Sequence, residues 1–309
     1  MNRLGIFYAM RAFLIFTLFI VACLLAAAAL FYPAWLGVSA VAEIPPHKLL
    51  TRLAKVVAAI GLVLLLRRMQ LLNRRSLGYG LEKSRFLAAV ARGWAAGTAI
   101  MLVPFAVLIL LGARELDTST LTLTLVSATA AKALLAGLAV GFVEETFFRG
   151  AIYAGIRRDG GLWTAIILSS VIYAALHFIR TQPFDPSEPL GWTSGFPLLV
   201  TAFHKFGSPA IWDSFVALMA AGAFLALLRA WTGNIALAIG VHAGWVMMIK
   251  LGKRVTDPVP DSGYGFLSGT YDQVIGWLAA AWLAVLITWL ARRAMAADAA
   301  RKTGVPSRG

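Results

Sequence analysis

The chain has 309 residues, of which 60 % are hydrophobic and only 14 % are charged, and its mean hydropathy is +0.79. Soluble domains hold roughly 45–50 % apolar and about 25 % charged residues, so this composition excludes an ordinary soluble protein. The net charge of +14 would suggest nucleic acid as a partner of a soluble chain. Here the basic residues cluster between apolar runs, as expected beside anionic lipid. We therefore expect the lipid bilayer, and not nucleic acid, as a partner.

The apolar runs are close to the length of about 20 residues that crosses a hydrocarbon core. They predict an all-α polytopic membrane protein with about eight transmembrane helices around a polar intramembrane site. The predicted spans are 13–36, 49–66, 87–111, 123–148, 162–179, 211–228, 235–249 and 274–290. The fourth is expected to continue as helix to Arg157, because the first interruption is Asp159-Gly160-Gly161.

We expect three parts along the chain: N-terminal transmembrane helices over 1–120, a core with the polar motifs over 121–252, and an outer loop, a last helix and a basic tail over 253–309. Basic residues follow the second, fourth, sixth and eighth spans, which predicts that both termini are cytoplasmic. Only the basic group at 250–254 breaks this alternation. The expected location is the inner (plasma) membrane of a bacterium. Two outer loops, 181–209 and 252–270, are long enough to act as lids or to be plain surface connections.

Charged side chains within the fourth span are the first candidates for chemistry, since an ionisable group at the bilayer centre costs about 2.5–3.5 kcal/mol on insertion scales. Glu145 and Arg149 are four residues apart, so they share a helix face and can pair. Glu144 is rotated by about 100° from that face. Its carboxylate is therefore expected to be the unpaired one and to be available as a general base.

Histidines in two later spans are predicted to lie at a similar depth. Glu144 and His177 are equally far in sequence from the turn at Gly160-Gly161. On two antiparallel helices both would then lie roughly 24 Å from that turn, at a rise of 1.5 Å per residue. His242 is near the middle of the short seventh span. One glutamate and two histidines can activate a water molecule or bind zinc. The alternative is that they are structural groups that join helices by hydrogen bonds.

The polar residues stand in order on successive spans, in three short motifs: Glu144-Glu145 with Arg149, Tyr173 four residues before His177, and His242 in a His-Ala-Gly-Trp run. This arrangement resembles the motifs of the CAAX-protease and bacteriocin-processing family, also called the CPBP or Abi family of intramembrane endopeptidases, which is related to the CAAX prenyl endoprotease. The resemblance covers about residues 127–249. It implies a multi-helix membrane protease.

The resemblance implies that Glu144 and His177 activate the attacking water and that His242 stabilises the oxyanion. The family also has an asparagine four residues after the third-motif histidine, where this chain has Val246. Another donor, such as the indole of Trp245 or a backbone amide, would have to serve. Glu145, Arg149 and Tyr173 would be supporting residues, and Glu145 with Arg149 would orient the helix that carries Glu144.

The expected function is hydrolysis of a peptide bond in a membrane-anchored substrate, possibly a lipidated protein or a C-terminal tail, by a glutamate-activated water without a cofactor. Three alternatives stay open at this point. One is a zinc-dependent peptidase that uses Glu144, His177 and His242 as ligands. The others are a proton-coupled transporter, and a non-catalytic scaffold or immunity protein that keeps the fold.

Overall fold

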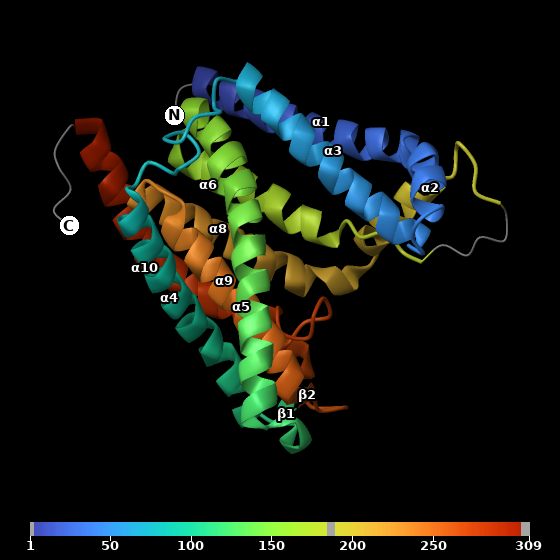
Figure 1. Cartoon of the computed structure of the whole chain (residues 1–309). Coiled ribbons are helices and arrows are strands. Elements are labelled where there is room, and N and C mark those ends of the chain that lie inside the picture. Colours follow the sequence, from blue (N-terminus) through green and yellow to red (C-terminus); the bar gives the residue numbers. More distant parts are fainter. Residues whose placement is uncertain (1–2, 184–188, 304–309) are drawn as a thin grey trace.

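A computed structural model describes residues 3–183 and 189–303. Helices dominate this part of the chain (Figure 1). The long helices are α1 (Arg3–Ala29), α3 (Pro46–Arg68), α4 (Lys83–Leu110), α5 (Leu123–Glu145), α6 (Tyr153–Phe178), α8 (Trp212–Thr232), α9 (Ala236–Val255) and α10 (Trp277–Thr303). The short ones are α2 (Phe31–Ser39), α7 (Gly195–Val200), the 3-10 helices η1 (Thr118–Thr120), η3 (Thr201–Gly207), η4 (Pro209–Ile211) and η5 (Gly265–Leu267), and the π-helix η2 (Thr146–Ile152). The two strands described are β1 (Arg114–Leu116) and β2 (Thr256–Pro258). The prediction of an all-α polytopic membrane protein is confirmed.

Seven helical segments are long and apolar enough to cross a membrane within the described residues. They are Met10–Ala29, Pro46–Arg68, Lys83–Leu110, Leu123–Arg158, Gly160–Phe178, Pro209–Thr232 and Trp277–Thr303. The seventh predicted span, 235–249, is present as α9, which is not among these segments. Its sequence includes His242, Lys250 and Lys253, which lower its hydropathy. Helix α9 is instead enclosed by other helices of the protein, so it needs less lipid-facing apolar surface.

The expected hairpin between the fourth and fifth spans is present. Helix α5 continues through the π-helix η2 into the start of α6, so the helical path runs from Leu123 to Arg158. Gly161 then adopts φ 83° and ψ 177°, which breaks the helix and reverses the chain. Because an L-residue rarely adopts a positive φ of this kind, glycine suits this turn. The seven-residue π-helix lies directly after Glu144 and Glu145, and such segments are frequent at functional sites.

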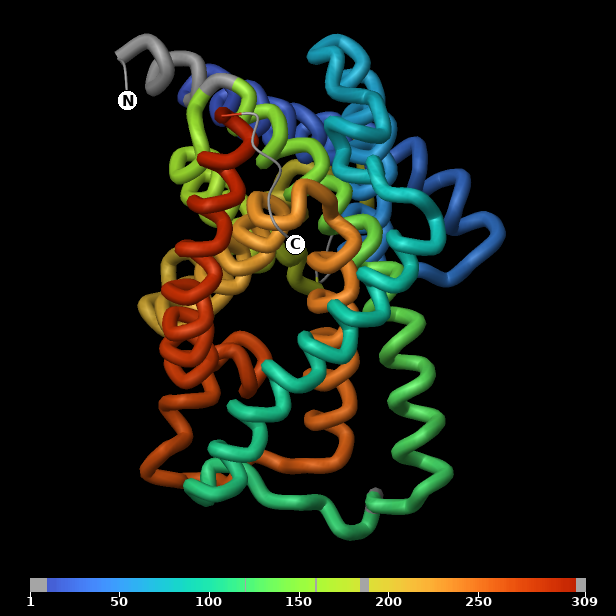
Figure 2. Tube along the Cα trace, turned by 90° about the vertical axis from the view of Figure 1, so that its left-hand side faces the viewer, coloured from blue at the N-terminus to red at the C-terminus, as the bar shows by residue number. Residues whose placement is uncertain are grey.

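Helix α9 packs against both α4 and α5 through pairs of small residues (Figure 2). Each of the three helices has two glycines four residues apart: Gly93 and Gly97 on α4, Gly137 and Gly141 on α5, and Gly240 and Gly244 on α9. A Cβ atom on any of these six would lie within 3.0 Å of a backbone atom of the facing helix. Small residues at this spacing let membrane helices approach closely. His242 lies between the two glycines of α9, so this packing brings its side chain to α5.

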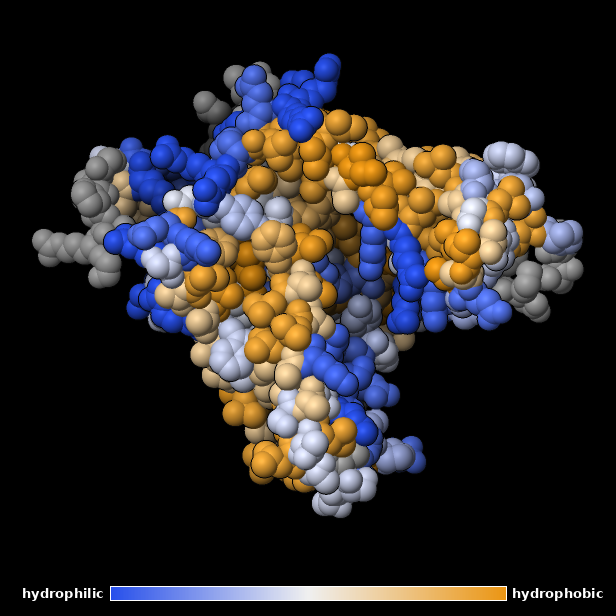
Figure 3. All heavy atoms as spheres, in the orientation of Figure 1, coloured by the Kyte–Doolittle hydropathy of each residue, from blue (hydrophilic) through white to orange (hydrophobic). Residues whose placement is uncertain are grey.

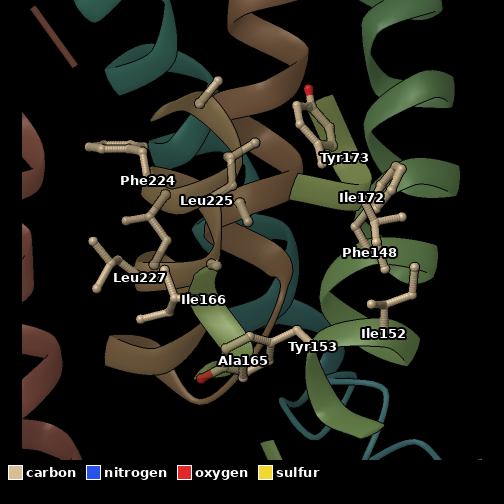
Figure 4. Packing of buried hydrophobic residues seen from close by; sticks show 14 of the residues in the cluster. Phe148, Ile152, Tyr153, Ala165, Ile166, Ile172, Tyr173, Phe224, Leu225 and Leu227 are labelled. Carbon is tan, nitrogen blue, oxygen red and sulfur yellow. The ribbon is translucent and has the colours of Figure 1, made fainter. Parts of the chain in front are cut away.

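The main apolar core lies between the α5–α6 hairpin and α8 (Figure 4). Phe148 and Ile152 of the π-helix face Ile172 of α6, while Phe224 and Leu225 approach from α8. A second, smaller core joins α1, α2, α3 and α7, which form one arm of the molecule in Figure 1. Apolar atoms cover much of this arm in the space-filling view, as expected of a surface in contact with lipid (Figure 3).

Basic side chains hold one end of the molecule together, the end at which hydrophilic atoms gather at the upper left of Figure 3. Arg157 forms an ion pair with Asp298 of α10. Arg229 donates to the carbonyl of Ser76, and Arg301 donates to the carbonyls of Ala230 and Trp231 at 2.6 and 2.7 Å. Cations near helix C-termini satisfy free carbonyls and favour the helix dipole. Part of the high positive charge is therefore structural.

Both long loops contain ordered segments within the described residues. The loop 181–209 includes α7, whose Leu198 is buried against α1 and α3. Ser187 of the same loop belongs to the stretch 184–188, which lies outside the described residues. The loop after α9 begins with β2, which pairs antiparallel with β1. Arg114 of β1 is only 2 % exposed and donates to the hydroxyl and carbonyl of Thr256 and to the carbonyl of Gln273.

Candidate active site

The two adjacent glutamates of α5 meet the same imidazole ring, that of His242 on α9. His242 Nδ1 lies 2.8 Å from Glu145 Oε1, and its Nε2 lies 3.8 Å from Glu144 Oε2. The first distance is a hydrogen bond and the second is too long for one. A carboxylate accepts and cannot donate, so Nδ1 carries the proton of that bond. His242 is therefore a link between the glutamates, a contact that sequence spacing does not predict.

The expected pair of Glu145 and Arg149 is present and is buried completely. Arg149 Nη1 donates to Glu145 Oε1 at 2.9 Å, and the two side chains are 0 % and 1 % exposed. Arg149 Nη2 donates to the carbonyl of Gly222 on α8 at 2.9 Å. The guanidinium also lies 4.6 Å from the centre of the Tyr173 ring. These contacts tie the helix that carries the glutamates to α6 and α8.

His177 and Tyr173 lie one helical turn apart on α6, with ring centres separated by 4.4 Å. His177 Nδ1 is 2.7 Å from the backbone carbonyl oxygen of Tyr173. Because that oxygen can only accept, Nδ1 is the protonated nitrogen, and Nε2 of the neutral ring is an acceptor. The ring of Tyr173 is also 6.4 Å from that of His242. Tyr173 thus contacts both histidines as well as Arg149.

Exposure sorts the polar residues into two groups. Glu145, Arg149, Tyr173 and His242 are all at most 4 % exposed. The Glu144 side chain is 30 % exposed, and His177 is also partly exposed. Glu144 Oε2 itself is buried and has no hydrogen-bond partner among the described residues. Only the partly exposed group can be reached by an incoming molecule, and the buried group supports it from behind.

Two residues outside the predicted set also reach this region. Tyr271 comes from the loop after α9, and its ring lies 6.4 Å from that of His177 and 5.3 Å from that of Phe178. Tyr79 comes from the loop after α3 and hydrogen-bonds to Thr146, whose own hydroxyl donates to the carbonyl of Phe142. No motif identified either tyrosine, because both lie in loops whose path is set by tertiary packing.

The pKa of both tyrosines is raised, and the first cause in each case is burial. The hydrogen bond with Thr146 opposes the rise in the pKa of Tyr79, while the charge of Glu145 adds to it. Asp272 and Glu144 add to the rise in the pKa of Tyr271, and Arg180 opposes it. Both phenols therefore keep their protons at neutral pH and can donate hydrogen bonds.

Trp245 lies on the same helix as His242 but lines a different space. Its ring is tilted against that of Phe224, with 5.6 Å between the ring centres. The side chain also borders an apolar cavity between α4, α8, α9 and α10. The cavity lining includes neither glutamate of the pair and neither His177 nor His242. The indole Nε1 is buried and has no hydrogen-bond partner in the described part of the chain.

The candidate residues do not fit a metal site as they are arranged here. A catalytic zinc centre needs three protein ligands that converge on one point. Among the residues described, no group of three or more His, Cys, Asp or Glu side chains is placed to hold a metal ion. We derive no step through a metal.

Comparison with known proteins finds a family match over part of the chain. Residues 126–248 match the family described as Rce1-like, Type II CAAX prenyl endopeptidase Rce1-like. Over this region the chain is therefore similar to the CAAX-protease family. The matched region contains all of the residues predicted for the site, from Glu144 to Trp245. No curated protein and no solved structure matches the chain.

This similarity, together with seven helices able to span a membrane, supports an integral membrane protein with a region like that of the CAAX proteases. The match begins within α5 and ends within α9. Helix α4, which packs on α9, and the loop that carries Tyr271 lie outside it.

Proposed function

We propose that the protein is a glutamate-dependent intramembrane endopeptidase that hydrolyses a peptide bond of a membrane-anchored substrate. The observation that carries the proposal is the state of Glu144. Its carboxylate is partly exposed, its Oε2 has no hydrogen-bond partner among the described residues, and a histidine nitrogen stands 3.8 Å away. A carboxylate in this setting is suited to accept a proton from a bound water.

Glu144 takes one proton from the water, and the water oxygen attacks the carbonyl carbon of the scissile peptide bond. His177 supports this step as an acceptor, because its Nδ1 proton is committed to the carbonyl of Tyr173 and its Nε2 is free to orient the water. Glu144 then passes the proton to the leaving amine as the carbon–nitrogen bond breaks. The products are a carboxylic acid, which then loses its proton to solvent, and an amine, and Glu144 returns to its ionised form.

His242 was expected from the sequence to stabilise the oxyanion. Its hydrogen bond to Glu145 supports a second role, that of tying α9 to the helix that carries both glutamates. In the neutral ring Nε2 has no proton to donate, so only the protonated ring could bind an oxyanion directly. Glu145 and Arg149 hold the imidazole in place through their buried ion pair.

We propose prenylated or otherwise lipidated C-terminal tails as the substrates, since the matching family is described as a prenyl endopeptidase. The scissile bond would reach Glu144 from between the helices. We also propose the inner membrane of a bacterium as the location, with both termini in the cytoplasm.

The central test compares the purified wild-type protein with Glu144→Gln in liposomes that contain a farnesylated fluorogenic peptide. Loss of general-base catalysis is expected to lower kcat by about 10²–10⁴-fold. Glu115→Gln is the matched control, because Glu115 lies exposed on the β1 strand. Full cleavage by Glu144→Gln would exclude the mechanism. Metal analysis of the same samples with a chelator tests the zinc alternative, for which stoichiometric zinc would disappear together with activity.

A further inference from the structure

The site has acceptors on its accessible side but needs a donor. Hydrolysis of a peptide bond places a negative charge on the former carbonyl oxygen, and hydrogen-bond donors there are usually the largest source of stabilisation. The Nδ1 protons of His177 and His242 are both committed to oxygen atoms that can only accept. Either Nε2 could donate only if its ring carried a second proton. Val246 offers no side-chain donor either.

Two other donors near the site, Arg149 and Trp245, are out of reach of a substrate. Arg149 is 1 % exposed and is bound to Glu145 and Gly222. Trp245 is 7 % exposed and faces the apolar cavity. Tyr271, in contrast, is partly exposed, and its ring meets the edge of His177. The charge of Glu144 is among those that affect its pKa, so the phenol and the proposed base are electrostatically coupled.

The segment that presents Tyr271 is fixed on three sides. The Tyr271 amide donates to Ser214 Oγ of α8 at 3.3 Å, and the neighbouring Thr270 hydroxyl donates to the carbonyl of Ala210. On the other side, Arg114 donates to the carbonyl of Gln273. Asp272 accepts the amides of Val274 and Ile275 at 3.0 and 2.7 Å. Such anchoring gives the phenol a defined position, as preorganised donors require.

A cation strengthens this phenol as a donor. Lys205 Nζ of η3 lies 5.6 Å from the centre of the Tyr271 ring. A positive charge near the ring draws electron density from the aromatic system, as in other cation–π pairs. The phenolic hydrogen becomes more positive as a result. Burial at the same time keeps the pKa of the phenol raised, so the proton stays on the oxygen.

We propose that Tyr271 is a catalytic residue whose phenol donates a hydrogen bond to the oxyanion formed on the scissile carbonyl, from a loop outside the family-matched region. This rests on the proposed endopeptidase function. In the tetrahedral intermediate the phenol O–H would face the charged oxygen, while Glu144 holds the proton taken from water. No proton is transferred from Tyr271, and the bond is released when the carbonyl re-forms.

The experiment compares wild type with Tyr271→Phe, which keeps the ring contacts with His177 and Phe178 and removes only the hydroxyl. Loss of one oxyanion donor is expected to lower kcat on the farnesylated peptide by about 10²–10³-fold, with KM nearly unchanged. Tyr264→Phe is the control, because Tyr264 is in the same loop and is 48 % exposed. It should retain the wild-type rate.

A second measurement separates this role from a structural one. A peptide of the same sequence with a phosphinate in place of the scissile bond mimics the charged tetrahedral state. Tyr271→Phe should weaken its binding by the same factor as kcat, while binding of the uncleaved peptide, measured in the Glu144→Gln background, should not change. An unchanged kcat, or a lower kcat with unchanged phosphinate binding, overturns the proposal for Tyr271. Full cleavage by Glu144→Gln would instead overturn the proposed function.

Discussion

His242 donates a hydrogen bond across the α9–α5 interface to Glu145, at 2.8 Å between Nδ1 and Oε1. Glu145 Oε1 accepts from Arg149 as well, so two donors from two helices share one carboxylate oxygen. The shared oxygen makes the orientation of the His242 ring depend on the Glu145–Arg149 pair. Through Nε2, the same ring faces Glu144.

Removing one partner of the buried Glu145–Arg149 ion pair should therefore destabilise the protein more than removing both. Arg149→Met leaves Glu145 charged in a site that is 0 % exposed, and removing one partner of a buried pair typically costs about 3–5 kcal/mol. We expect a large fall in the free energy of unfolding, measured by thermal or SDS denaturation in mixed micelles. The double variant Glu145→Leu with Arg149→Met should lose less than Arg149→Met alone, because no unpaired charge remains.

An exposed pair of the same types provides the control for this measurement. Arg85 and Glu82 lie 3.9 Å apart, with side chains 79 % and 72 % exposed. Exposed pairs contribute little to stability. Arg85→Met should leave the unfolding transition close to that of the wild type. An equal loss in Arg149→Met and Arg85→Met would contradict the structural role given to the buried pair.

The close approach of α9 to α4 predicts a strong effect of side-chain volume at Gly240. A Cβ there would collide with the backbone carbonyl of Val90, and leucine would add three further carbon atoms. Gly240→Leu should force the helices apart, displace His242 from Glu145 and lower both thermal stability and peptidase activity. Gly37→Leu is the matched control, since no atom lies within 4 Å of a Cβ at that position. Similar behaviour of the two variants would rule out the glycine contact.

The sequence predicts the helices and the hairpin well because both depend on local patterns. The π-helix and the turn at Gly161 keep the predicted path from Leu123 to Phe178, so Glu144 and His177 fall on the two arms of one hairpin. The Glu145–Arg149 pair follows from helical spacing alone. The first predicted span, by contrast, is two helices, α1 and α2, which are separated at Leu30.

The contacts of His242 and Tyr271 cannot be predicted from local sequence patterns. Which glutamate His242 meets depends on the rotation of α9 against α5, which the glycine pair at 137/141 sets by contact with the α9 backbone, while the pair at 240/244 holds α9 against α4. This spacing is visible in the sequence and is the signal that could have indicated the interface. The position of Tyr271 depends on anchors from α8 and β1, which no spacing rule connects.

The orientation in the membrane can be tested at the two ends of the helices. The loop with Ser76, bound to Arg229, lies at the basic end, and Ser119 is exposed near the β1–β2 ribbon at the other. In a Cys23→Ala background, we expect an impermeant thiol reagent applied to intact cells to label Ser119→Cys and not Ser76→Cys. Labelling of Ser76→Cys from outside would reverse the proposed orientation.

Asp272 predicts a pH dependence of stability in the loop that carries Tyr271. Burial is the main cause that raises its pKa above the ordinary value of 3.8, although Lys253 and Arg114 oppose the rise. A carboxyl whose pKa is higher in the folded state contributes stability below its unfolded pKa and loses it as the pH rises through the folded value.

Asp272→Asn keeps an oxygen that can accept the amides of Val274 and Ile275, because both bonds go to Oδ1. The variant should therefore have a higher Tm than wild type at pH 7–8, and the difference should vanish below about pH 3, where the aspartate is protonated in both states. A Tm difference that stays constant down to low pH, measured in a detergent stable over that range, would show that ionisation of Asp272 does not destabilise the loop.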